Sequence, residues 1–156
     1  MVKKVKKGFT LVELLAVIVL LGIIMAIAIP GIYKIRDKMN EKALEAKINT
    51  IETAAVSYVQ SNSNLLKSHY GLCDINNQNE NCVCKSEDDC KYHFTINIKT
   101  LITSGDLKKE TLEGENCDVP NPTDKNKCLD CLNINITLSA KYKTATAKLD
   151  LNAGEC

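Results

Sequence analysis

The chain has 156 residues, which suits one small domain joined to an extended segment. Its 20 basic and 19 acidic side chains leave a formal net charge of +1. Bulk charge therefore gives no support for nucleic-acid binding, and no nucleic-acid partner is expected. The two histidines have no nucleophile motif beside them, and the chain carries no glycine-rich phosphate loop. We expect no enzyme activity, no cofactor and no resident metal.

A basic leader, residues 1–8, precedes an apolar segment, residues 9–29. As a helix, these roughly 21 apolar residues are long enough to span about 30 Å of hydrocarbon. The four leader lysines are expected to keep the amino terminus in the cytoplasm and to place the chain after Pro30 outside. Removing the leader would leave 16 basic and 19 acidic side chains, a charge of about −3. The sequence predicts a single-pass protein of the cell membrane.

Glu13 is the only charged residue of the apolar segment. A charge at mid-membrane costs about 2.5 to 3.5 kcal/mol on insertion scales. One interpretation is an acid that lies harmlessly at the membrane interface. The other is that Glu13 awaits a positive partner, and cleavage after Gly8 would create one by freeing the α-amine of Phe9. An amine from a neighbouring copy would then set the register between subunits.

The run Gly8-Phe9-Thr10-Leu11-Val12-Glu13-Leu14, followed by Gly22 and Pro30, resembles the amino terminus of type IV pilins and pseudopilins. The resemblance covers residues 1 to about 60. It implies that a prepilin peptidase cuts between Gly8 and Phe9 and methylates Phe9. It also implies that Glu13 serves methylation and docking, and that the helix can lose order between Gly22 and Pro30. Pro30 cannot donate a hydrogen bond to the carbonyl of Ala26, which makes a kink there physically reasonable.

An ordinary signal peptidase offers a different outcome for the same segment. Met25 to Ala28 supply an A-x-A pattern after a basic region, so that cleavage would release a protein beginning at Ile29. The apolar segment is longer than the usual signal core, and Glu13 would then have no explanation.

Residues 30–62 keep a helical period but become amphipathic. One stripe is apolar, and charged side chains fill the opposite face. The segment Ser61-Asn62-Ser63-Asn64 predicts the end of the helix and a loop. Residues 65–92 contain few apolar side chains and are not expected to form a core without other support.

Eight cysteines lie after the predicted membrane segment. An even number in an exported domain indicates disulfides, and each could contribute roughly 2 to 5 kcal/mol to a small core. The connectivity is not readable, but Cys82 and Cys84 are expected to have different partners. Zinc held by the Cys82/Cys84 and Cys128/Cys131 pairs is the alternative, and a thioredoxin-like role for Cys128 and Cys131 is weaker. The predicted disulfide cysteines are Cys73, Cys82, Cys84, Cys90, Cys117, Cys128, Cys131 and Cys156.

Alternating apolar residues predict strands in the last third of the chain. The alternation of Phe94, Ile96 and Ile98 predicts a short strand. The run from Thr100 to Gly105, together with Leu107, predicts a helical turn that ends at the glycine. Residues 132–140 and 145–151 predict a terminal hairpin. The expected fold is α+β: a long amino-terminal helix, membrane-spanning in its first half, packs on a small antiparallel sheet with a disulfide-rich carboxyl-terminal region. The expected divisions are 1–8, 9–29, 30–62 and 63–156.

These observations predict a structural subunit that is processed after Gly8 and polymerised into a filament on the cell surface. The expected partners are other copies of the chain, minor pilins, the prepilin peptidase, a membrane assembly platform and, before assembly, the membrane itself. Major pilin, minor adhesive pilin and pseudopilin of secretion or competence all stay open. The alternative is a tethered or secreted disulfide module that binds a ligand without polymerising.

Overall fold

The computed structural model describes residues 9–110, 116–124, 126–141 and 144–152. The chain divides into two compact units, residues 1–40 and 41–156, and each is described by itself. The first unit holds most of the apolar half of helix α1 (Leu11–Ser61), with Pro30 inside the helix. The second unit holds the remaining turns of α1 and every other element of the described chain.

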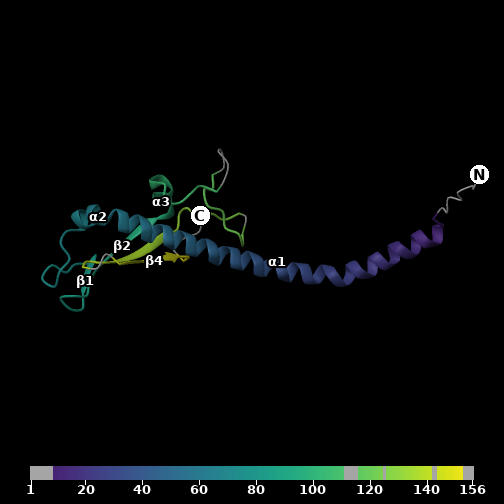
Figure 1. Ribbon diagram of the computed structural model, residues 1–156, viewed down its shortest axis with the longest axis horizontal. Helices are drawn as coiled ribbons and strands as arrows, with labels where there is room; N and C mark the ends of the chain where they lie inside the picture. Colours follow the sequence, from purple (N-terminus) through teal and green to yellow (C-terminus); the bar gives the residue numbers. More distant parts are fainter. Residues whose placement is uncertain (1–8, 111–115, 125, 142–143, 153–156) are drawn as a thin grey trace, which may run out of the picture. The chain divides into compact units, whose positions relative to one another are not determined.

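Four strands form one antiparallel sheet in the order β1-β2-β3-β4 (Figure 1). They are β1 (Cys82–Cys84), β2 (Cys90–Asn97), β3 (Asn133–Ser139) and β4 (Ala145–Asp150). In β3 the side chains alternate, so that Ile134, Ile136 and Leu138 are buried while Asn133 and Asn135 are exposed. This alternation is what a sheet with one solvated face requires.

The last turns of α1 cover the apolar face of the sheet (Figure 1). Ile51, Ala55 and Val59 recur at four-residue spacing and are fully buried, so one stripe of the helix contacts the core. The predicted α+β fold, with a long helix on a small antiparallel sheet, is confirmed. The core that Ile51, Ala55 and Val59 share with the rest of the second unit includes Tyr92, Phe94, Ile98, Leu101, Ile134, Ile136, Leu138 and Leu149.

The loop predicted at Ser61 to Asn64 is wrong in part, because helix α2 (Ser63–Tyr70) begins there. Tertiary contacts explain the helix. The Tyr70 ring stacks on Phe94 with centroids 5.3 Å apart, and the Lys67 ammonium donates to the Ala140 carbonyl over 2.9 Å. These contacts fix α2 against the sheet although its own sequence carries few apolar residues.

Helix α3 (Ile98–Ser104) begins at Ile98, which the alternation of apolar residues had placed in the preceding strand. Asn97 ends β2 and caps α3, because its side chain accepts hydrogen bonds from the Thr100 amide and hydroxyl. Gly105 closes the helix with φ of 85°, a conformation that favours glycine. The helical turn that ends at Gly105 is as predicted.

Candidate functional site

The candidate site is the beginning of α1, where Glu13 lies one turn inside the helix. The Thr10 amide and hydroxyl both donate to Glu13 Oε2 over 2.9 Å, and the Glu13 amide donates to the Thr10 hydroxyl over 3.3 Å. This reciprocal pattern is a capping box. Within the single chain, Glu13 therefore has local partners that satisfy its carboxylate.

The sequence interpretation missed this role of Thr10. The signal was present, because Thr10-Leu11-Val12-Glu13 has the T-x-x-E spacing of a capping box directly before an apolar run. The capping box explains how the chain begins its helix.

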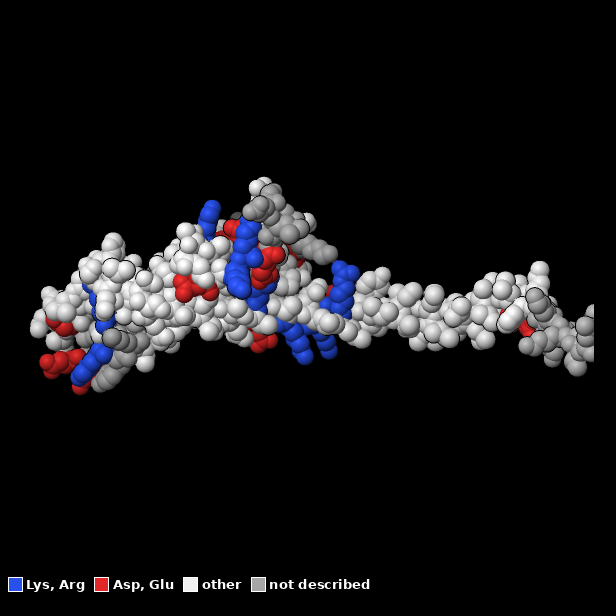
Figure 2. All heavy atoms as spheres, turned by 45° about the horizontal axis from the view of Figure 1, so that its top comes forward, with Lys and Arg blue, Asp and Glu red and all other residues white. Residues whose placement is uncertain are grey.

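The apolar side chains that follow are unusually exposed for a folded protein. In Figure 2 the first half of α1 is white apart from one acidic patch near its beginning. Phe9 is 84% exposed, and Leu11 is 80% exposed. Among the described residues, α1 is the helix that is long and apolar enough to cross a membrane, as judged by length and composition. A surface of this kind needs lipid or protein to cover it.

The other predicted assembly residues, Gly22 and Pro30, both lie inside α1. A Cβ added to Gly22 would meet nothing within 4 Å outside the adjacent helix backbone. Gly8, the predicted processing residue, falls outside the described residues.

Three disulfides are placed in the second unit: Cys73–Cys82, Cys84–Cys90 and Cys117–Cys128. Cys131 is disulfide-bonded as well, and Cys156 lies outside the described residues. Cys82 and Cys84 have different partners. The four cysteines proposed as a zinc set are not brought together, because Cys82 and Cys84 group with Cys73 whereas Cys128 groups with Cys117 and Asp130.

Buried or partly buried polar contacts hold two stretches of the second unit, one within residues 65–92, which were not expected to form a core without other support, and one near Cys117–Cys128. The Tyr92 hydroxyl donates to the Gly71 carbonyl and accepts from the Cys73 amide, which anchors the start of the loop from Cys73 to Cys82. Asp130 accepts from the amides of Asp118 and Val119 over 2.7 and 2.6 Å, inside the stretch closed by Cys117–Cys128. The disulfides thus act together with polar anchors that sequence reasoning did not find.

The long helix α1 begins with a capping box at Thr10 and Glu13, and its last turns cover an antiparallel sheet. Residues 3–29 match the family described as the prokaryotic N-terminal methylation motif. The amino-terminal segment is therefore similar to that of the type IV pilins and pseudopilins, as the Gly8 to Leu14 run predicted.

Individual relatives give the same result. The chain is 41% identical over 56 residues to the type IV narrow pilus major component PilA5 of Thermus thermophilus. This match covers 35% of this chain and 48% of that protein. It is 31% identical over 67 residues to type II secretion system core protein G of Klebsiella michiganensis, covering 43% and 47%. The ComG operon protein 3 homolog of Bacillus licheniformis is 34% identical over 53 residues, covering 34% and 55%.

The chain thus spans about half the length of these curated relatives. No solved structure matched it. The names of these relatives describe components of a pilus and of a secretion system and a ComG operon protein. The apolar helix and these similarities fit membrane anchoring and a surface filament.

Proposed function

We propose that the protein is a structural subunit of a type IV pilus-like filament and has no catalytic activity of its own. A prepilin peptidase cleaves it between Gly8 and Phe9, and the subunit polymerises through residues 9–29. The observation that carries the proposal is the methylation motif over residues 3–29, joined to an apolar helix whose side chains are exposed in the single chain.

In this proposal the uncut subunit is stored in the membrane with its amino terminus in the cytoplasm. The lysines at positions 3, 4, 6 and 7 favour that orientation. A membrane assembly platform then transfers the subunit into a filament of the same chain and minor pilins, where neighbouring helices replace lipid around the apolar surface. The second unit would be displayed outside the cell.

The capping box suggests how one glutamate serves two stages. Thr10 satisfies the carboxylate while the subunit is stored, and the α-amine of a neighbouring Phe9 replaces or supplements Thr10 during assembly. The amine is charged and Thr10 is not, so the ion pair depends on the negative charge of Glu13 whereas the capping box does not.

Three substitutions separate these roles. Glu13→Gln keeps a side-chain oxygen for the capping box and removes the charge. Glu13→Ala removes both, and Thr10→Ala removes only the capping hydroxyl. Each variant would be expressed in the native cells, and its amount in sheared filaments compared with its amount in the membrane.

We expect Glu13→Gln and Glu13→Ala to reach the membrane normally and both to be lost from filaments, whereas Thr10→Ala is incorporated. If Glu13→Gln is incorporated as well as the native chain, the charge has no role in assembly.

The amino terminus and the mass of the native protein provide the companion test. Methylated Phe9 supports the proposal, whereas a terminus at Met1 or Ile29 supports the non-polymerising module.

A further inference from the structure

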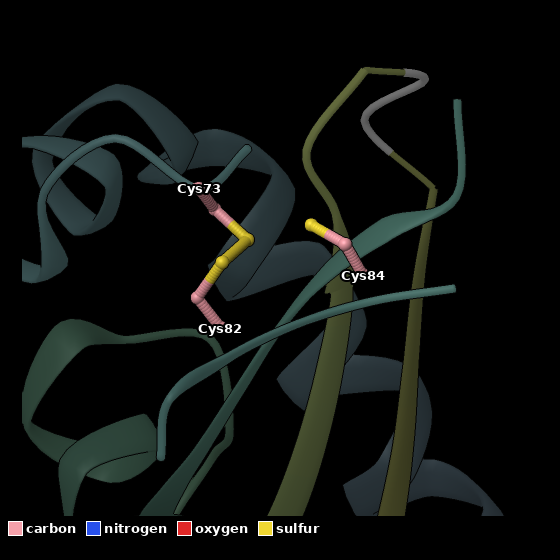
Figure 3. Close-up of side chains that lie close together, drawn as sticks. All are labelled: Cys73, Cys82 and Cys84. Carbon is pink, nitrogen blue, oxygen red and sulfur yellow. A yellow bond between two sulfur atoms is a disulfide. The ribbon is translucent and has the colours of Figure 1, made fainter. Parts of the chain in front are cut away.

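Three cysteine sulfurs form one group at the end of the second unit that carries β1. Cys73 and Cys82 are bonded to each other, and the sulfur of Cys84 lies within 4.8 Å of both. Figure 3 shows the Cys84 side chain pointing toward the Cys73–Cys82 disulfide. A thiolate at Cys84 would therefore have a disulfide as its immediate neighbour.

The sheet explains why Cys84 takes this position and Cys90 does not. Cys82 and Cys84 are two residues apart in β1, so their side chains point to the same face. Cys90 lies directly opposite Cys84 in β2 and is bonded to it. The sulfur of Cys90 does not belong to the group of three, although it is bonded to one member.

Burial distinguishes the sulfurs further. Cys73 and Cys90 are each 5% exposed and Cys82 is 1% exposed, whereas Cys84 is half-buried. Of these four cysteines, Cys84 is therefore the most exposed residue and the one that an external thiol can approach most readily. Access and thiolate formation together set the rate of exchange.

We propose that Cys84 is the nucleophile of an intramolecular thiol–disulfide exchange with Cys73–Cys82. An external dithiol first attacks Cys84, releases Cys90 as a thiol, and closes to its own disulfide as it frees Cys84. The Cys84 thiolate then attacks the sulfur of Cys73. A Cys73–Cys84 bond forms, the Cys73–Cys82 bond breaks, and its electron pair leaves on the sulfur of Cys82. The second step consumes no oxidant or reductant.

Attack at Cys73 is favoured over attack at Cys82 by the geometry of the strand. Two residues along a strand span about 6.6 Å, which is near the upper limit of the Cα separation that a disulfide accepts. Cys73 comes from a different segment, the loop after α2, and has no such restriction. The exchange lengthens the closed loop by two residues.

The exchange would remodel a surface that contains exposed apolar side chains. Leu72 is 71% exposed, and Ile75 and Val83 are each 45% exposed, all beside or within the loop that the exchange redefines. The surface that this loop presents would therefore depend on the external thiol–disulfide balance. The exchange does not depend on polymerisation.

A pair of variants tests the proposal in the full chain held in detergent. Cys90→Ser leaves Cys84 without its disulfide partner, and Cys84→Ser leaves Cys90 in the same condition. Both variants lose the Cys84–Cys90 disulfide. Free thiols are labelled with N-ethylmaleimide at acidic pH, disulfides are then reduced and labelled with iodoacetamide, and fragmentation of the tryptic peptide containing residues 73–84 assigns each label.

In Cys90→Ser we expect maleimide on both Cys84 and Cys82. In Cys84→Ser we expect it on Cys90 alone. The label on Cys82 should therefore be at least about tenfold higher in Cys90→Ser than in Cys84→Ser. Maleimide confined to Cys84 in Cys90→Ser would overturn the exchange. If Cys90→Ser does not fold, native protein treated with limiting dithiothreitol gives the answer. Label on Cys82 supports the proposal, and label on only Cys84 and Cys90 refutes it.

Discussion

Lys47 shows how much one side chain can organise at the surface of α1. Its ammonium contacts Glu110 Oε2 at 2.5 Å and donates to the Pro120 carbonyl over 2.8 Å, and the side chain is only 15% exposed. Both partners lie in the stretch between α3 and β3. The described residues of that stretch belong to no helix or strand, so Lys47 is a tether between them and α1.

Lys47→Met keeps the aliphatic stem and removes the tether. We expect the free energy of unfolding to fall by about 1 to 2 kcal/mol, because one charge-assisted bond is partly buried while the Glu110 side chain is 45% exposed and screened. Urea unfolding of the full chain in detergent measures the loss. Lys99→Met, at an exposed lysine of α3, is the matched control and should change little. Equal losses in the two variants would refute the tether.

Asp89 and Lys91 form an exposed pair near the β1–β2 turn. The hydrogen bond that the Lys91 ammonium donates over 2.9 Å holds the pKa of Asp89 below its ordinary value. Because the folded pKa is depressed, any contribution of the pair to stability is present above the unfolded pKa and is lost as pH falls through the folded pKa. Lys91→Met should raise the pKa of Asp89 toward 3.8. Carboxyl titration by NMR measures it, and an unchanged pKa would exclude Lys91 as the cause.

At the scale of elements, β4 is an edge strand whose backbone needs a partner. Glu52 of α1 supplies one, because its Oε1 accepts from the Leu149 amide over 3.0 Å. A helix side chain thus caps a sheet edge 97 residues away in the sequence. The contact both orients α1 on the sheet and occupies one of the groups that would otherwise be open to another strand.

Glu52→Gln and Glu52→Ala separate the acceptor from the charge. The glutamine keeps an oxygen for the Leu149 amide and should cost little, whereas alanine leaves that amide without its acceptor and should cost about 1 to 3 kcal/mol. Hydrogen exchange at the Leu149 amide, followed beside urea unfolding, provides the measurement. Faster exchange in Glu52→Gln to the same extent as in Glu52→Ala would show that charge, and not the hydrogen bond, is responsible.

The elements differ in how far the sequence predicts them, and the reason is physical. The β3–β4 hairpin is recognisable because its apolar residues alternate and pair locally. Helix α2 is not, because its support comes from Phe94 and Ala140, which lie far away in the chain. The capping box at Thr10 was readable from local spacing. Disulfide pairing was not, because it depends on how β1 and β2 pair and on where the loop from Cys73 lies.

At the scale of the whole molecule, the described core belongs to one unit. The first core contact along the chain is at Leu44, and the fully buried positions of α1 begin at Ile51. The apolar half of α1 contributes side chains that are exposed in the single chain. Folding of the second unit should therefore not require the segment that we propose for the membrane and the filament.

A fragment of residues 41–156 tests this separation. We expect it to be soluble, to contain the Cys73–Cys82, Cys84–Cys90 and Cys117–Cys128 pairs, and to melt within about 4 °C of the full chain in detergent, a difference of roughly 1 kcal/mol. A fragment of residues 56–156 lacks Ile51 and Ala55 and also loses Lys47 and Glu52, so it should not fold cooperatively. If both fragments fold equally well, the end of α1 is not part of the core. If neither folds, the apolar half of α1 stabilises the second unit, and the two units cannot serve storage and display independently.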